Sequence, residues 1–209
     1  MKKSVLFALA TFFSATTMVS ANEPAKKEAD AANGKVISAT CAACHGADGN
    51  SVNPAWPKLA GQGEAYLMKQ LVDFRSDKRS DPSMSAMAKG IKSDSDVADL
   101  SAYYASQKAK SGTANKDLIA EGQAIYRGGV MSSGVAACAA CHGPSGSGNA
   151  AAKFPKISGQ HATYTINQLK AFKTGKRSND TGKMMRNIAL KMTDAEMEAV
   201  AEYIAGLHD

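Results

Sequence analysis

The stretch TCAACHGADG, residues 40–49, places two cysteines three residues apart and a histidine directly after the second cysteine. The stretch ACAACHGPSG, residues 137–146, repeats this arrangement in the second half of the chain. The chain has four cysteines, and these two motifs contain all of them. Because no cysteine remains outside the motifs, the sequence does not indicate an ordinary disulfide framework, and we expect both motifs to serve one purpose.

The similarity between the two halves of the chain extends well beyond these motifs. Residues 57–81 (PKLAGQGEAYLMKQLVDFRSDKRSD) align with residues 155–179 (PKISGQHATYTINQLKAFKTGKRSN) at a constant offset of 98. Residues 93–104 likewise align with residues 193–204 at an offset of 100. An internal repeat of this length indicates two copies of one small fold that arose by duplication.

The boundaries of these copies follow from local composition. We expect a first domain over residues 22–110 and a second over residues 111–209, joined at the polar stretch QKAKSGTANK. Residues 1–21 have a basic start, a short apolar run and a small-residue end, which predicts a signal peptide cleaved after Ala21. A retained membrane anchor would need about 20 mainly apolar residues. The mature chain is therefore expected in the periplasm, without a transmembrane segment.

Both copies are predicted to be all-α. Apolar side chains recur at helical spacing, as in Val97, Leu100 and Tyr104, and no sustained two-residue alternation indicates a sheet. Ser93 and Thr193 each stand three residues before an acidic side chain, which predicts capping boxes at the start of these helices. Further helices are expected around residues 31–39, 64–74, 117–126 and 163–172.

The charge of the chain favours one class of partner over another. The formal net charge is +6, with +1 in residues 22–110 and +3 in residues 111–209. This mild excess suits an encounter with an acidic protein surface. It is too weak and too dispersed to indicate nucleic-acid binding.

The Cys-x-x-Cys-His motif is typical of covalent haem attachment. On a helical turn Cys41 and Cys44 point the same way, so both sulfurs can bond one edge of a planar macrocycle while His45 reaches its iron. The same roles are predicted for the second motif, which consists of Cys138, Cys141 and His142. The alternatives are a zinc site shared by the two motifs, a thioredoxin-like redox pair, or disulfides within each motif. Two motifs in register with a repeat, in an exported chain, favour two covalently bound haem c groups.

A haem iron held by histidine on one face leaves a position for a second ligand on the other. Of the 10 methionines, only Met84 and Met185 occupy the same position in both copies, 39 and 43 residues after the motif histidines. We predict that both are thioether ligands, which would raise the reduction potential and close the iron to substrates. Met87 and Met184 are the nearest rivals for this role.

The remaining histidines and two aromatic residues carry weaker signals. His161 and His208 have no histidine counterpart in the other copy and are expected at the surface. Trp56 and Phe154 stand just before the repeated Pro-Lys pair. We expect these two rings to pack near the haem, although an ordinary core role is equally compatible with their positions.

With the duplicated Cys-x-x-Cys-His motifs, FPKISGQ, YTINQLKAFKTGKRSND and the paired methionines assembled, the chain resembles the cytochrome c4 family over nearly its whole mature length. That family consists of dihaem proteins built from two class I cytochrome c domains in tandem. The resemblance supports the ligand sets named above. It also implies that the backbone carbonyls of Pro57 and Pro155 accept hydrogen bonds from the ligating histidines, which would fix the rings.

In function, the resemblance implies a periplasmic single-electron carrier rather than an enzyme. Such a carrier takes electrons from a respiratory complex and delivers them toward a haem–copper terminal oxidase, often in peripheral association with the inner membrane. A dihaem peroxidase is the alternative from another class, and it requires one copy without a usable methionine. An electron-transfer subunit of a dehydrogenase complex would share the chemistry and differ only in its partner.

Overall fold

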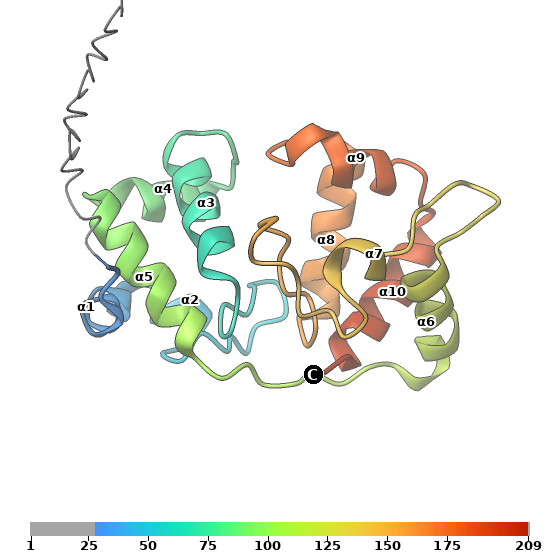
Figure 1. Ribbon diagram of the computed structural model, residues 1–209, viewed down its shortest axis with the longest axis horizontal. Helices are drawn as coiled ribbons and strands as arrows, with labels where there is room; N and C mark the ends of the chain where they lie inside the picture. Colours follow the sequence, from blue (N-terminus) through green and yellow to red (C-terminus); the bar gives the residue numbers. More distant parts are fainter. Residues whose placement is uncertain (1–27, 209) are drawn as a thin grey trace, which may run out of the picture.

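The computed structural model describes residues 28–208 of the chain. The predicted signal peptide, residues 1–21, lies outside these residues. Within them every regular element is a helix, and the only strand-like pairings are isolated bridges at Val130–Val135 and Asn149–Phe154. The all-α prediction is therefore confirmed for the described part of the chain. Figure 1 shows two similar groups of helices side by side, one from each half.

The two halves present their helices in the same order. The first half contains α1 (Ala31–Ile37), the 3₁₀ turn Ser38–Thr40, α2 (Ala42–His45), α3 (Glu64–Arg75), α4 (Pro82–Gly90) and α5 (Asp94–Ser106). The second half contains the 3₁₀ turn Lys116–Leu118, α6 (Ile119–Gly128), α7 (Ala139–His142), α8 (Ala162–Lys173), the 3₁₀ turn Thr181–Lys183, α9 (Met184–Ala189) and α10 (Asp194–Gly206). None of the helices within residues 28–208 combines the length and apolar character needed to cross a bilayer.

Only one of the two predicted capping boxes is complete. At the start of α10, the Thr193 hydroxyl accepts from the Glu196 amide while the Glu196 carboxylate accepts from the Thr193 amide. At the start of α5, the Ser93 hydroxyl accepts from the Asp96 amide, and the return bond is absent. Aspartate is one methylene shorter than glutamate, which accounts for the missing contact. The prediction is confirmed at Thr193 and wrong in its second half at Ser93.

In each half the first and last helices cross where one of them carries a glycine. A Cβ atom on Gly34 of α1 would lie 2.0 Å from the carbonyl oxygen of Asp99 in α5. A Cβ atom on Gly122 of α6 would lie 2.1 Å from the carbonyl oxygen of Ala199 in α10. Both distances are far inside van der Waals contact, so the backbones approach this closely only because glycine has no side chain.

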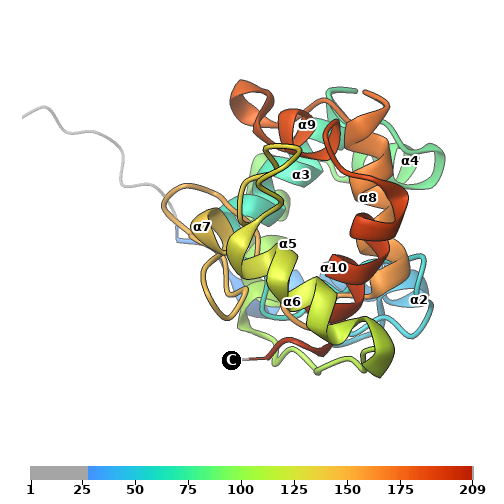
Figure 2. The ribbon, with the colours of Figure 1, turned by 90° about the vertical axis from the view of Figure 1, so that its right-hand side faces the viewer.

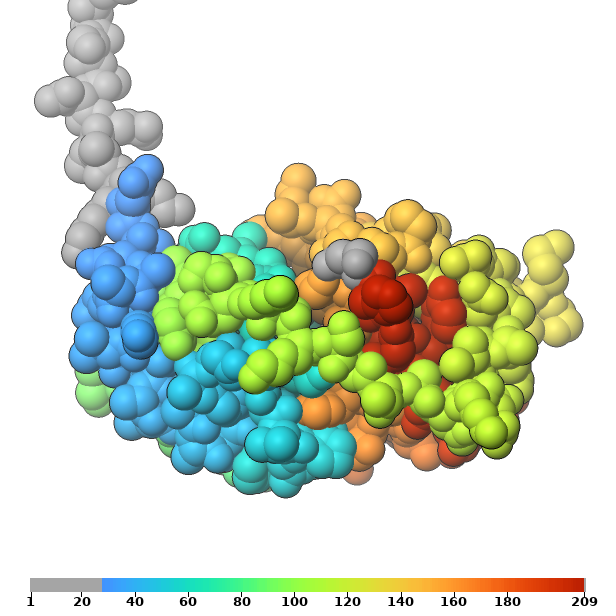
Figure 3. Space-filling view, turned by 90° about the horizontal axis from the view of Figure 1, so that it is seen from below, coloured from blue at the N-terminus to red at the C-terminus, as the bar shows by residue number. Residues whose placement is uncertain are grey.

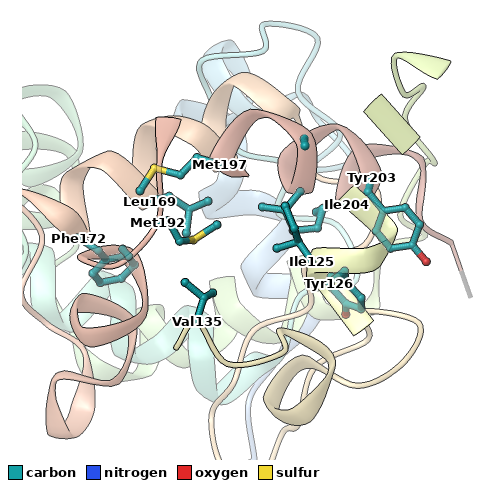
Figure 4. Packing of buried hydrophobic residues seen from close by; sticks show 12 residues of the cluster. Ile125, Tyr126, Val135, Leu169, Phe172, Met192, Met197, Tyr203 and Ile204 are labelled. Carbon is teal, nitrogen blue, oxygen red and sulfur yellow. The ribbon is translucent and has the colours of Figure 1, made fainter. Parts of the chain in front are cut away.

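Each half has its own apolar core beside its Cys-x-x-Cys-His helix. The core of the second half is the larger one, and Figure 4 shows its side chains converging between α6, α8 and α10. Its buried members are Ile125, Tyr126, Val135, Leu169, Phe172, Ala189, Met192, Met197, Ala199, Val200, Tyr203 and Ile204. The core of the first half is centred on Leu67, Leu100, Tyr103 and Tyr104.

The polar stretch between the halves is fastened at several points. The side chain of Asn50 donates to the Lys108 carbonyl at 3.0 Å and accepts from the Lys110 amide at 2.8 Å. At the other end, the Asn115 amide donates to the carboxylate of Glu202 in α10 at 2.8 Å. Seen from below in Figure 3, this segment runs across the junction between the halves. The predicted linker is therefore a strap that ties both halves together.

The two halves meet through a reciprocal set of hydrogen bonds related by the sequence repeat. Gln62 donates to the Lys156 carbonyl and accepts from the Lys156 amide, both at 2.8 Å. Its counterpart Gln160 donates to the Lys58 carbonyl at 3.0 Å and accepts from the Lys58 amide at 2.9 Å. Each glutamine thus pairs with the backbone of the other half, as in the isologous interface of a two-fold symmetric dimer.

Two buried arginines extend this interface. Arg79 donates to the Tyr164 hydroxyl at 3.0 Å and to Gln168 Oε1 at 2.9 Å, both across the interface. Its counterpart Arg177 donates to the Tyr66 hydroxyl at 3.0 Å and to Gln70 Oε1 at 3.1 Å, in the opposite direction. Because these groups are largely buried and hydrogen-bonded, the interface is specific and not a loose contact between two tethered domains.

Candidate cofactor-binding sites

Both Cys-x-x-Cys-His motifs form the predicted helical turns, α2 and α7. In each turn the first cysteine is half-buried, the second is exposed and the histidine is buried. The four sulfur atoms are free of disulfide bonds, which contradicts the alternative of a disulfide within each motif. Within the described residues no group of three or more histidine, cysteine or acidic side chains could hold a metal ion, so a zinc site shared by the two motifs is also wrong.

The electrostatics of the first cysteine in each motif argue against a thioredoxin-like redox pair. Burial raises the pKa of Cys138 to about 11, and burial likewise raises the pKa of Cys41. A redox-active pair needs the opposite, a thiol whose pKa is lowered so that it reacts as a thiolate. The surrounding structure is also helical, without the strand–helix context of such pairs.

The imidazole rings of both motifs are fixed by the predicted proline carbonyls. His45 Nδ1 donates to the Pro57 carbonyl oxygen at 2.9 Å, and His142 Nδ1 donates to the Pro155 carbonyl oxygen at the same distance. Burial lowers the pKa of both histidines, so each ring is neutral near pH 7. With the proton held on Nδ1, the lone pair of Nε2 is left for a metal. The prediction of proline acceptors is confirmed in both halves.

The four candidate methionines differ in exposure. Met84 and Met185 are half-buried, whereas the rivals Met87 and Met184 expose 45% and 41% of their surface. Met185 and Cys138 pack against the same apolar cluster, so the candidate ligand and the candidate tether of the second half lie beside one another's packing partners. Exposure therefore favours the two methionines that the repeat had singled out.

Each candidate methionine is presented by a segment that an aspartate holds in place, but in different ways. In the first half, the Asp81 carboxylate accepts directly from the Met84 amide at 2.9 Å. In the second half, the Asp180 carboxylate accepts from the Arg186 amide at 3.0 Å and from its guanidinium at 2.7 Å. There, Lys183 has a φ of 58°, in the left-handed region. The chain runs eight residues from Arg177 to Met185 but only five from Arg79 to Met84, which is consistent with the different geometry.

Burial alone would raise the pKa of Asp180, but the hydrogen bonds from the Arg186 amide and guanidinium hold it below its usual value. The carboxylate is therefore ionised at neutral pH. An ionised acceptor makes stronger hydrogen bonds than a neutral one, so this contact fixes the turn that precedes Met185.

The structure corrects two of the weaker expectations. His161 is half-buried between the halves, where its Nε2 lies 3.0 Å from the Ser51 hydroxyl and 2.9 Å from the Ser51 carbonyl oxygen. It is an interface residue, whereas His208 is exposed as expected. Trp56 exposes 41% of its surface, so a core role for it is wrong. Phe154 lies with its ring centroid 6.4 Å from that of His142, beside the second candidate site.

Two tyrosines support the motif helices, and sequence reasoning did not find them. The hydroxyl of Tyr103 donates to the Ala47 carbonyl at 2.7 Å, and that of Tyr126 donates to the Gly143 carbonyl at 2.6 Å. These bonds hold the chain directly after each motif histidine. The two tyrosines come from α5 and α6, which are not equivalent helices, so the repeat gave no signal for the pair.

Comparisons with known proteins agree with this geometry. The cytochrome c family model matches residues 31–108 and 119–208. Cytochrome c4 of Pseudomonas aeruginosa is 49% identical over 180 residues, which cover 86% of this chain and 89% of the relative. The crystal structure of reduced recombinant cytochrome c4 from Pseudomonas stutzeri is similar with a TM-score of 0.83 and 44% identity, covering 86% of this chain and 100% of that one.

A further relative carries a more specific name. A thiosulfate dehydrogenase electron acceptor of Thiomonas intermedia is 41% identical over 172 residues, covering 80% of this chain and 78% of the relative.

Proposed function

This chain belongs to the cytochrome c4 family within the wider cytochrome c family, and from that premise we propose which residues serve each haem and which partners exchange electrons with it. The chain is a dihaem electron carrier of two tandem cytochrome c domains, with two covalently bound haem c groups as cofactors. When bound, a haem c supplies a centre that takes up and releases one electron.

The chain's own residues are assigned to the two haems by half. In the first half, Cys41 and Cys44 form the thioether tethers, and His45 and Met84 are the axial ligands. In the second half the same roles belong to Cys138, Cys141, His142 and Met185. The observation that carries this assignment is the pair of equal hydrogen bonds from the histidine Nδ1 atoms to proline carbonyls, which aim one free nitrogen in each half.

The surrounding residues adapt both sites to electron transfer rather than to catalysis. Met84 and Met185 are half-buried, and as second ligands they would leave neither iron with an open position for a substrate. A peroxidase would need one such position, so this feature supports a carrier. The hydrogen bonds that fix the two histidine rings would limit their movement when an electron arrives or leaves, which favours fast transfer.

For the location and the partners, we infer a periplasmic carrier that serves a haem–copper terminal oxidase. The sequence of residues 1–21 supports export, and the basic surface suits an acidic docking site on the acceptor. A second candidate follows from the relative in Thiomonas intermedia, whose name is thiosulfate dehydrogenase electron acceptor. In that case the donor is a dehydrogenase, and the chemistry of the chain is unchanged.

Mass spectrometry of the exported protein tests the haem assignment. We expect the mass of the chain without residues 1–21 plus two haem groups, and the loss of one haem when Cys138 and Cys141 are both replaced by alanine. A mature chain with the mass of the bare polypeptide would overturn the assignment. Carbon monoxide binding to the reduced protein at neutral pH separates a carrier from a peroxidase, because only an open or loosely ligated iron binds it.

Oxidation of the reduced protein by membranes of the source bacterium tests whether a haem–copper oxidase is the acceptor. We expect the reduced protein to be oxidised by these membranes in a reaction that cyanide inhibits, since cyanide blocks haem–copper oxidases. Failure of the wild-type protein to react would contradict the oxidase and leave the dehydrogenase as the partner to examine by pull-down from solubilised membranes.

A further inference from the structure

Exposed apolar side chains occur on a hairpin and at both ends of the α9 segment in the second half. Met131, at the tip of a hairpin formed by residues 129–135, exposes 94% of its surface. Leu190 and Met184, at the two ends of the α9 segment, expose 65% and 41%. The Lys191 ammonium donates to the Gly134 carbonyl at 3.0 Å and so ties the hairpin to the end of α9. Figure 2, which views the molecule from the end where the hairpin projects, shows the hairpin in front of α9.

We call the residues Met131, Lys183, Met184, Leu190 and Lys191 the hairpin–α9 surface. The hairpin belongs to the nine additional residues that the second half carries between Gly122 and Cys138, relative to Gly34 and Cys41 in the first half. The first half therefore has no equivalent of this surface.

The hairpin–α9 surface shares an apolar cluster with the second candidate haem site. Val135, on the inner side of the hairpin, is 4% exposed and belongs to the apolar cluster against which Val130, Cys138, Met185 and Ile188 pack. One cluster thus joins the hairpin, a haem tether and the α9 segment. A protein seated on this surface would lie over the apolar cluster that also contacts the tether Cys138 and the candidate ligand Met185.

The sequence charge of this region differs from that of the equivalent region of the first half. Residues 170–191 contain seven lysines and arginines and one aspartate, a net charge of +6. Of these basic side chains, Arg177 is buried between the halves, Lys170 pairs with Asp194 and Arg186 pairs with Asp180. The aligned residues 72–91 contain four basic and three acidic side chains, a net charge of +1. Within that first-half segment Lys89 pairs with Asp77, whereas Lys183 is exposed and forms no ion pair within the described residues.

We propose that the hairpin–α9 surface is the docking site for a redox partner that presents an apolar contact ringed by carboxylates. The apolar side chains supply the area buried in the complex, and the surrounding lysines supply charge complementarity and steering. A second copy of this chain is a poor occupant, because two surfaces of the same positive charge repel each other. One electron passes between the docked proteins; one partner is oxidised and the other reduced, and no covalent bond forms or breaks.

This proposal rests on the proposed function as an electron carrier, and it adds that exchange with the partner occurs through the second half. Two pairs of variants of the full, haem-loaded chain test it. Met131→Glu is matched by Val52→Glu, because Val52 in the first half is also 94% exposed. Lys183→Glu is matched by Lys89→Glu, which reverses an exposed lysine on α4 of the first half.

The measurement is the second-order rate of oxidation of the reduced protein by membranes of the source bacterium at low ionic strength. We expect Met131→Glu and Lys183→Glu to lower this rate roughly threefold to tenfold and to flatten its salt dependence, as for loss of steering at an interface. The controls Val52→Glu and Lys89→Glu should stay within about twofold of the wild type. Equal rates in all four variants, or larger losses in the first-half pair, would overturn the proposal.

Three further measurements, namely ferricyanide oxidation, vesicle binding and sedimentation, distinguish a protein partner from the other possible occupants of this surface. If the wild-type protein does not react with the membranes, the oxidase partner is wrong, and oxidation by ferricyanide, a small anion, then decides about the surface. Slower ferricyanide oxidation of Lys183→Glu than of Lys89→Glu supports the proposal, and equal rates overturn it. Binding to vesicles of anionic phosphatidylglycerol that is lost only in the second-half variants would assign this surface to the membrane and overturn a protein partner. Sedimentation of the wild type as a dimer that Met131→Glu dissociates would assign the surface to a second copy of the chain and would also overturn the proposal.

Discussion

Each motif histidine donates to a proline carbonyl 12 or 13 residues further along the chain, and this one bond settles both its tautomer and the direction of its free nitrogen. The methionine on the other side is held less directly. Its side chain has three rotatable bonds and a polarizable sulfur, so it adapts to the position that its backbone segment provides. Those segments differ between the halves, at Asp81 and at Asp180, so the ligand contribution of each methionine has to be tested separately.

Replacement of Met185 by leucine tests the ligand of the second half. Leucine has no donor atom, so we expect Met185→Leu to remove about half of the weak Met-to-iron absorption and to lower one of the two reduction potentials, as for loss of a thioether ligand. Met184→Leu, at the adjacent exposed residue, is the control and should leave the spectrum and both potentials unchanged. A spectrum altered by Met184→Leu instead would assign the ligand to the rival.

Asp48 provides a pH test at the strap between the halves. The hydrogen bond from Lys110 lowers the pKa of Asp48 to about 2, with a further contribution from the Asn50 amide. Since the folded pKa lies below the unfolded value near 3.9, the carboxylate contributes stability above about pH 4 and loses it as the pH falls toward 2. The Lys110 and Asp48 side chains expose 70% and 45% of their surface, so solvent screens the pair and the effect is small.

Acid unfolding of Asp48→Asn measures this contribution. We expect the variant to be slightly less stable than the wild type at pH 5, with the two curves converging near pH 2. A difference that grows as the pH falls would contradict the role of the Asp48 carboxylate.

At the scale of the elements, the crossing of α6 and α10 depends on Gly122. An alanine Cβ atom there would meet the Ala199 carbonyl oxygen at 2.1 Å, so the helices must separate. Overpacking of this kind costs typically about 1–3 kcal/mol, and a contact this short places Gly122→Ala at or above the upper end. Gly128→Ala, in the same helix with nothing within 4 Å of the added atom, should be neutral or stabilising by up to about 1 kcal/mol. Chemical unfolding of both variants checks this, and similar stabilities would contradict the crossing.

The helices were accessible to sequence reasoning because local signals specify them. The spacing of Val97, Leu100 and Tyr104 predicts the buried face of α5, and all three residues are buried. The start of α10 at Thr193 follows from its capping box. The supporting tyrosines were not accessible, because the bond from Tyr126 to Gly143 joins residues whose proximity depends on how α6 packs over α7.

At the scale of the whole molecule, the sequence indicates two copies but not how they meet. The motif residues and their proline acceptors follow from local spacing and from the family resemblance, since they lie within short stretches of each copy. The interface contacts join residues about 100 positions apart, such as Lys58 and Gln160. The only sequence signal for this interface is that Gln62 and Gln160 are identical across the repeat. An identical glutamine could equally form hydrogen bonds within its own copy, and only the packed structure shows that it bonds to the other copy.

The reciprocal glutamines predict how the molecule unfolds. Gln62 and Gln160 are buried, with 7% and 9% of their surface exposed, and each satisfies both backbone groups of one lysine in the other half. Replacement of both by alanine leaves these backbone groups without partners, at a cost of roughly 1–3 kcal/mol for each unsatisfied group. The bonds to the two lysines are lost at the interface, and within each half only the bond from the Gly63 or His161 amide to the glutamine Oε1 is lost with them. We therefore expect one calorimetric transition in the wild type and two separate transitions in the double variant Gln62→Ala, Gln160→Ala.

Gln107→Ala is the matched control for this unfolding experiment. The Gln107 side chain donates to the Tyr103 carbonyl and to the Ser106 hydroxyl, so its bonds stay within one half. Its loss should weaken that half without uncoupling it from the other, and the single transition should shift without splitting. The coupling assigned to Gln62 and Gln160 is contradicted if the double variant still unfolds in one step whose calorimetric and van't Hoff enthalpies agree. In that case Arg79, Arg177 and the strap are sufficient to make the two halves one cooperative unit.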